Sequence, residues 1–219
     1  MNRILISIIL IFFFSAEMSA QELSVDVWHK GSIVLKTGDT LKGDLKYDAE
    51  ENILQYRYSN KMITLSPNKI TSFFFFDKLL KSNRYFKSLE YSPYSSYKPE
   101  MFFEVLVLGQ MTLLAREFIT YEVRMINDPF MTSDPYYNLY QNSASNYRHR
   151  RVVNYNFYFF DSQSKKSNVV QYKERKRDLY KIMSKKHDEI KSYIKEQKIM
   201  YNTRKGLMVI TEYYNSLFD

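Results

Sequence analysis

The stretch Ser32–Tyr47 reads SIVLKTGDTLKGDLKY and sets the pattern for the first part of the chain. Apolar and polar residues alternate on both sides of Gly38-Asp39, which is the pattern of two antiparallel strands joined by a tight turn. Gly43 lies inside the second strand, where a glycine usually marks a sharp bend. The stretch therefore predicts a bent β-hairpin with its turn at Gly38-Asp39.

Three more strands follow the hairpin, and together they predict a small barrel-like unit over residues 21–78. These strands are Ile53–Tyr58, Met62–Leu65 and Thr71–Phe76, separated by polar turns. Five short strands with tight turns favour a closed or half-closed barrel. The residues Ile33–Gly43 resemble the opening hairpin of Sm-like and SH3-like barrels.

A second antiparallel β unit is expected over residues 79–173. Its predicted strands are Met101–Leu108, Met111–Ile119, Val152–Phe160 and Asn168–Tyr172. Gly109-Gln110 separates the first two strands and suits a type II′ turn, whose first central residue has a positive φ. Residues 127–147 are rich in Asn, Ser, Tyr and Pro without a clear period, and predict a long surface loop.

Residues 174–219 change to a helical period and predict a cap of about three short amphipathic helices. The apolar stripes are Leu179, Ile182 and Met183, then Ile190, Tyr193 and Ile194, then Leu207, Ile210, Tyr214 and Leu217. Ser184 or Asp188 is expected to cap the second helix, and Asn202 or Thr203 the third. Such helices are not stable alone, so the stripes must dock on the β core or on a partner. The predicted fold class is α+β.

Residues 1–20 have the layout of a cleavable secretory signal. Arg3 precedes the apolar run Ile4–Phe14, and small and polar residues lead to Ala20, where cleavage is expected. A signal anchor is the alternative, but the run is short against the roughly 20 residues that span a bilayer. The chain has no cysteine, and export without disulfides favours a bacterial envelope: the periplasm or a secreted, cell-surface location.

Positive charge gathers near the C-terminus and suggests an interaction surface. The formal net charge is +8, and residues 164–208 carry 14 Lys and Arg against 5 Asp and Glu. The candidate basic residues are Lys173, Arg175, Lys176, Lys185, Lys186, Lys191, Lys195 and Lys198. An acidic envelope protein or an anionic membrane surface would match such a face. A solvated face without a partner is the alternative, and export argues against nucleic acid.

The chain is rich in aromatic residues, at 17% with 20 Tyr and 16 Phe, and most should fill the core. Tyrosines among Ser, Pro and Asn are different, because Tyr and Ser together make adaptable recognition surfaces. Tyr136, Tyr137 and Tyr140 are the candidates in the long loop, with Tyr91, Tyr94 and Tyr97 in an earlier one. They predict either a site for a glycan or a cover over a nearby apolar surface.

Motifs for catalysis, cofactors and metals are absent from the sequence. The five glycines form no phosphate-binding loop, and the three histidines are not paired, so no cofactor or metal is expected. Asp39, Asp44 and Asp48 crowd the first hairpin, but Asp at turns usually accepts hydrogen bonds from backbone N–H groups. An unrecognised carboxylate pair would be needed for a hydrolase.

A wider resemblance covers most of the chain beyond the signal. The signal peptide, the Gly31–Gly43 hairpin, the strand FFEVLV at Phe102–Val107 and the ending ITEYYNSL at Ile210–Leu217 resemble an uncharacterised family of exported Bacteroidota proteins. The resemblance implies an envelope or secreted location and carries no catalytic or ligand residues. We therefore expect a non-enzymatic interaction or scaffold module. The alternatives are a glycan- or lipid-binding module that uses the loop tyrosines, and a hydrolase.

Overall fold

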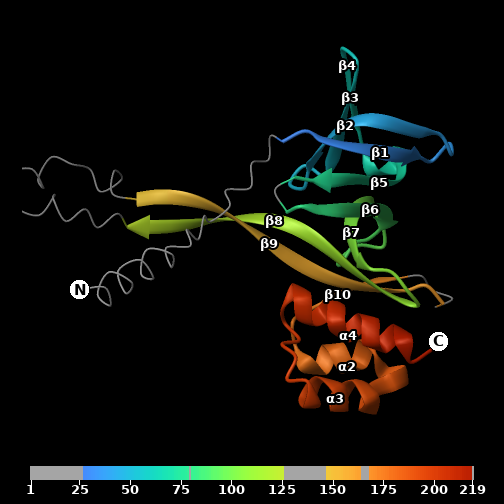
Figure 1. Cartoon of the computed structure of the whole chain (residues 1–219), viewed down its shortest axis with the longest axis vertical. Helices are drawn as coiled ribbons and strands as arrows, with labels where there is room; N and C mark the ends of the chain where they lie inside the picture. The colour runs from blue at the N-terminus through green and yellow to red at the C-terminus, as the bar shows by residue number, and fades with distance from the viewer. Residues whose placement is uncertain (1–26, 79, 126–146, 164–167, 219) are drawn as a thin grey trace, which may run out of the picture.

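One antiparallel sheet of ten strands runs through the described residues (Figure 1). The structure is a computed structural model that describes residues 27–78, 80–125, 147–163 and 168–218. The strands are β1 His29–Leu35, β2 Thr40–Asp48, β3 Ile53–Tyr58, β4 Lys61–Leu65, β5 Ile70–Asp77, β6 Ser82–Glu90, β7 Glu100–Val107, β8 Met111–Met125, β9 Tyr147–Asp161 and β10 Val169–Tyr172. Their order is β10-β9-β8-β7-β6-β5-β1-β2-β3-β4, so the two expected β units belong to one continuous sheet.

Three α-helices follow the last strand and confirm the α+β class. They are α2 Lys176–Ile182, α3 His187–Glu196 and α4 Arg204–Ser216, and the 3-10 turns η1 Pro67–Lys69 and η4 Ser184–Lys186 complete the described elements. Figure 1 shows the helices stacked at the β8–β10 end of the sheet, far from β3 and β4. Within the described part of the chain, no helix has the length and apolar character that a membrane span needs.

The predicted N-terminal cap is present in α4 and absent in α3. Thr203 precedes α4, and its hydroxyl oxygen accepts a hydrogen bond from the Gly206 N–H at 3.1 Å. The expected cap of α3 by Ser184 or Asp188 is wrong, because Lys186 holds the N-cap position and makes no side-chain cap. Ser184 instead begins η4, which leads directly into α3.

The predicted first hairpin forms, with its turn over residues 36–39, but a closed barrel does not. β1 and β2 pair across a turn in which Gly38 has a φ of +94°, a conformation that favours glycine. Gly31 lies directly opposite Gly43, so two residues without a Cβ meet across the strands. The closed barrel is wrong because β5 pairs with β6 as well as with β1, and the sheet stays open with β4 and β10 as its edges.

Gly43→Val is expected to lower the free energy of unfolding by about 1–3 kcal/mol, the usual cost of overpacking. A Cβ at Gly43 would lie 2.6 Å from the Arg57 carbonyl oxygen and 2.7 Å from Cε2 of Tyr56, so the backbone must shift. Chemical denaturation followed by circular dichroism measures the change. Thr40→Val on the exposed part of the same strand is the control and should change stability by less than about 0.5 kcal/mol. Equal stability of the two variants would contradict the prediction.

The β7–β8 hairpin is present, but its turn differs from the one predicted. Three residues, Leu108 to Gln110, separate the strands, and Gly38 is the one glycine with a positive φ among the described residues, so the type II′ turn is wrong. Gly109 is needed for space instead, because a Cβ there would collide with the side chain of Asn215 in α4. The turn is therefore shaped by contact with a helix.

Three apolar clusters make up the core. One joins β1–β7 around Phe73, Phe86 and Phe102, and a second joins β7–β10 to the inner faces of α2, α3 and α4. The third cluster lies on the other face of β7–β9, where Phe103 and Tyr158 pack under Tyr91. The β7–β8 hairpin is thus buried on both faces, as its apolar sequence predicted.

Candidate functional site

The helical region docks through its apolar stripes and turns its basic residues outward. Leu179, Met183, Ile190, Leu207 and Ile210 have no exposed surface. Of the predicted basic residues, seven are exposed and Lys186 is half-buried; the exposed ones are Lys173, Arg175, Lys176, Lys185, Lys191, Lys195 and Lys198. In α2 and α3, helical geometry places Lys176, Lys191 and Lys195 on the side away from the docked stripe. The predicted basic face is therefore available to a partner.

Two links fix the helical region to the sheet at α4. Arg204, at the start of α4, donates to both oxygens of Glu104 in β7, at 2.8 and 3.4 Å. Asn215, near the end of α4, accepts from the Met111 N–H and donates to the Met111 carbonyl oxygen, both at 2.9 Å. Asn215 belongs to the ending that carried the family resemblance, and its role here is structural.

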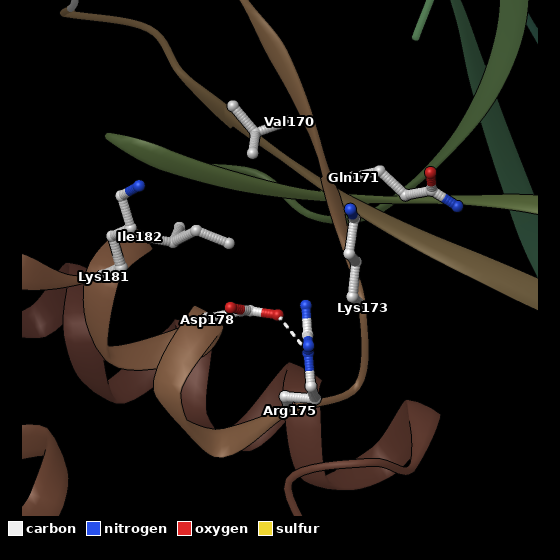
Figure 2. Close-up of a pocket in the computed structure, with 7 residues that line it drawn as sticks. All are labelled: Val170, Gln171, Lys173, Arg175, Asp178, Lys181 and Ile182. Atoms are coloured by element: carbon white, nitrogen blue, oxygen red, sulfur yellow. Dashed lines mark hydrogen bonds and ion pairs between the residues drawn. The ribbon is translucent and has the colours of Figure 1, made fainter.

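A surface pocket of about 380 Å³ lies between β10 and α2 (Figure 2). Val170 and Gln171 of β10 line it from one side, and Ile182 of α2 lines it from the other. The charged lining residues are Lys173, Arg175, Asp178 and Lys181. Pockets of this size hold small-molecule ligands. Three cations against one carboxylate give the pocket a formal charge of +2.

The charged side chains of the pocket are arranged by one ion pair. The Arg175 Nε donates to Asp178 Oδ2 at 2.9 Å, and Figure 2 shows the two side chains directed toward each other. This contact uses one edge of the guanidinium and leaves both terminal nitrogens available. Glu174 has a φ of +56°, an uncommon conformation for a residue other than glycine, at the point where the chain turns from β10 into α2.

The structure brings only part of the predicted site together. Lys173 and Arg175 meet in the pocket with Lys181, which the sequence analysis did not select. Lys185 instead pairs with Asp161 at 3.4 Å, and Lys186 with Glu189 at 3.5 Å. Lys176 lies over the ring of Tyr201, and Lys191, Lys195 and Lys198 lie on or just after α3. Tyr136, Tyr137 and Tyr140 lie outside the described residues, as do residues 1–20.

Lys181 could not be selected from the sequence, because its place in a pocket depends on how α2 packs against β10. The signal available was only the basic run to which it belongs. Within the described residues, neither Lys181 nor Lys173 forms an ion pair, so both ammonium groups are free to meet an anion.

The sequence analysis missed a buried ionic network, and also the strand β6 that supplies its central arginine. Arg84 of β6 donates from Nε and Nη2 to the two oxygens of Glu104, at 3.2 and 2.8 Å, and its Nη2 also donates to Glu117 of β8 at 2.6 Å. Its Nη1 lies 3.7 Å from Asp77 of β5. Tyr155 of β9 donates its hydroxyl to Glu117 at 3.2 Å. The network therefore takes one residue from each of five adjacent strands.

Within this network, Arg84 and Glu104 hold each other in the ionised state. Burial alone would raise the pKa of Glu104, but Arg84 and then Arg204 hold it below its usual range. Burial would lower the pKa of Arg84, and the Glu104 and Glu117 carboxylates reverse this and raise it. Because both oxygens of Glu104 already accept from arginines, this carboxylate is poorly suited to move protons for a reaction.

The carboxylates considered for a hydrolase do not converge. Asp48 accepts from the N–H groups of Glu50 and Glu51, both at 3.0 Å, which is the turn role expected of it. Asp44 pairs with Lys30 at 2.8 Å, and this hydrogen bond is the main cause of its lowered pKa. Asp39 accepts from the Thr37 hydroxyl at 2.8 Å. Each aspartate is therefore engaged in its own local contact.

Metal ligands are not grouped in the part of the chain that the structure describes: no three of its His, Cys, Asp and Glu side chains form a set that could hold an ion.

Comparison of the chain with protein-family models, with curated proteins and with solved structures finds no match.

Proposed function

We propose that this chain is an exported, non-enzymatic interaction module of the bacterial envelope, which binds an acidic partner protein or an anionic membrane surface. The observation that carries the proposal is the basic face, where seven of eight predicted cations are exposed while the apolar stripes beneath them are buried. Exposed charges of one sign repel one another, and an anionic partner relieves this repulsion. Export rests on the pattern of residues 1–20.

The proposal predicts that the protein is retained on an anionic surface at low salt and released as salt rises. Exposed charges are screened over about 8 Å at physiological ionic strength, so binding through them weakens with salt. Replacing Lys185, Lys186, Lys191 and Lys195 with Gln should abolish retention and leave the fold intact. Their ion pairs are exposed, and such pairs contribute about 0–1 kcal/mol each. The assay is co-sedimentation with phosphatidylglycerol vesicles and, in parallel, capture from the envelope fraction.

A matched control separates this face from the overall charge of the protein. Replacing Lys42, Lys61, Lys69 and Lys78 with Gln removes the same charge from exposed positions on or beside the β1–β6 part of the sheet. The control should bind like the parent. If the helical variant also binds like the parent, the basic face is a solvated surface and the proposal fails.

A second candidate is supported by two exposed tyrosines in the β6–β7 loop. Tyr94 and Tyr97 are 97% and 76% exposed, while Tyr91 beside them is buried against Phe103 and Tyr158. Exposed aromatic rings suit the faces of sugars, so a glycan is the ligand of this alternative. This alternative is favoured if capture from the envelope fraction does not change with salt and is the same for the parent and for both lysine variants.

We also propose that β1–β5 form a barrel-like unit of the Sm-like or SH3-like kind. The strand order β5-β1-β2-β3-β4 supports this. So does the packing of one buried residue from each strand, Ile33, Leu45, Leu54, Leu65 and Ile70, into one cluster.

A further inference from the structure

We propose that the pocket between β10 and α2 binds a phosphate monoester that carries a small apolar group. The proposal deepens the proposed function, because it assigns the class of anion that the basic region recognises at one defined place. It rests on the charge, the lining and the size of the pocket.

The charge of the pocket suits a dianion. Lys173, Arg175 and Lys181 contribute three positive charges and Asp178 one negative charge. A phosphate monoester carries about −1.5 to −2 near neutral pH and has three strong acceptor oxygens. A carboxylate or a phosphate diester carries a single charge and would leave part of the positive charge unbalanced.

The geometry of the pocket suits the fork of an arginine on a phosphate. Asp178 holds Arg175 through Nε, so both terminal nitrogens can donate to two phosphate oxygens in the bidentate manner that guanidinium groups favour. Figure 2 shows Lys173 beside Arg175 and Lys181 across from them, with Ile182 between. The pocket therefore has cations at both ends of its apolar surface.

The size and apolar lining suit a group attached to the phosphate. The volume of about 380 Å³ exceeds what inorganic phosphate fills, and Val170 and Ile182 offer apolar surface. The attached group could come from a soluble ester or from a lipid headgroup, and the shared chemistry is the phosphate monoester. The two sources are separated by the probes below.

The test is a calorimetric titration of the full chain with phenyl phosphate, and with benzenesulfonate as the monoanionic control. Phenyl phosphate should saturate the protein, and benzenesulfonate should bind about tenfold more weakly or not at all. Arg175→Gln and Lys181→Gln should each weaken phenyl phosphate binding by about tenfold or more, because each removes a charge-assisted hydrogen bond. Lys191→Gln, an exposed cation outside the pocket, should bind like the parent.

Vesicles distinguish the source of the phosphate. Vesicles of a zwitterionic lipid with added phosphatidic acid present a phosphate monoester, and those with added phosphatidylglycerol present a diester. If the parent is retained on the phosphatidic acid vesicles and Lys181→Gln is not, the phosphate belongs to a lipid headgroup. If the parent binds phenyl phosphate but is not retained on these vesicles, the ligand is a soluble ester.

Failure of phenyl phosphate to saturate, equal binding of benzenesulfonate, or parent-like affinity of Lys181→Gln would each overturn the proposal. The phosphatidylglycerol and capture experiments on the helical variant would still decide the proposed function, because the four lysines changed there do not line the pocket.

Discussion

Replacing Arg84 with methionine is expected to lower the free energy of unfolding by about 3–5 kcal/mol, the cost of leaving a buried ion partner without its counter-charge. Arg84 is 5% exposed and faces three carboxylates, of which Glu104 and Glu117 lie within 3 Å of its Nη2. Arg204 compensates only part of the charge, because it donates to Glu104 alone. Urea denaturation at neutral pH measures the loss.

Arg57→Met is the matched control for this variant. Arg57 also approaches a carboxylate, Asp44 at 3.5 Å, but its side chain is 44% exposed. Exposed pairs contribute about 0–1 kcal/mol, so this change should be small. If the Arg84 variant loses no more stability than the Arg57 variant, the network contributes little and its apolar surroundings hold the strands together.

The difference in free energy of unfolding between the Arg84→Met variant and the parent should become smaller as pH falls. In the parent, the pKa of Glu104 is lowered from 4.5, so its ionised form adds stability above pH 4.5 and this stability is lost as pH falls through the lowered pKa. Without Arg84, only Arg204 opposes the effect of burial, so the pKa of Glu104 is higher than in the parent and protonation relieves the uncompensated charge at a higher pH. A difference that is constant between pH 7 and pH 4 would contradict this account.

Asn215→Leu should lower the free energy of unfolding by about 2–4 kcal/mol. Asn215 satisfies both the N–H and the carbonyl of Met111, a residue that is 3% exposed, and each buried group left without a partner costs about 1–3 kcal/mol. Thermal and urea unfolding measure the change.

Two further variants locate the effect in these hydrogen bonds. Ser216→Ala changes the next residue of α4, which is exposed, and should cost less than about 0.5 kcal/mol. Asn215→Asp keeps the acceptor for the Met111 N–H and loses the donor, so its stability should lie between those of the parent and Asn215→Leu. If Asn215→Leu and Ser216→Ala are equally stable, α4 is held by its apolar stripe alone.

Local pattern predicted most of the strands in this chain. Ile53–Tyr58 forms with its predicted bounds, and β4, β5 and β10 differ from prediction by a residue at one or both ends. These segments are short, alternate clearly and are bounded by polar turns, so neighbouring residues alone define them. The helices likewise follow their apolar stripes, because a docked helix needs one buried face.

The network could not be predicted in the same way, because it depends on which strands become neighbours. The pocket could not be predicted either, because it depends on how α2 packs against β10. One signal was present: Glu104 stands inside the apolar strand FFEVLV, and a buried carboxylate needs a cationic partner. Its partners, Arg84 and Arg204, are 20 and 100 residues away in the chain. Strand register places Arg84 and Glu104 on one face, and no periodicity within a single strand contains that information.

The order of strands in the sheet has a consequence for how the chain folds. Among the described strands, eight of the nine neighbouring pairs join elements that are also consecutive in sequence, and the exception is β1 with β5. Most consecutive pairings close short loops and cost little chain entropy, whereas β8 and β9 are separated by residues 126–146. The β1–β5 pairing must bring Leu35 to Ile70, and it joins the β1–β4 strands to the β5–β10 strands. The Arg204 and Asn215 links join residues that are 100 and 104 positions apart, so they close far longer stretches of chain than the turns between consecutive strands do.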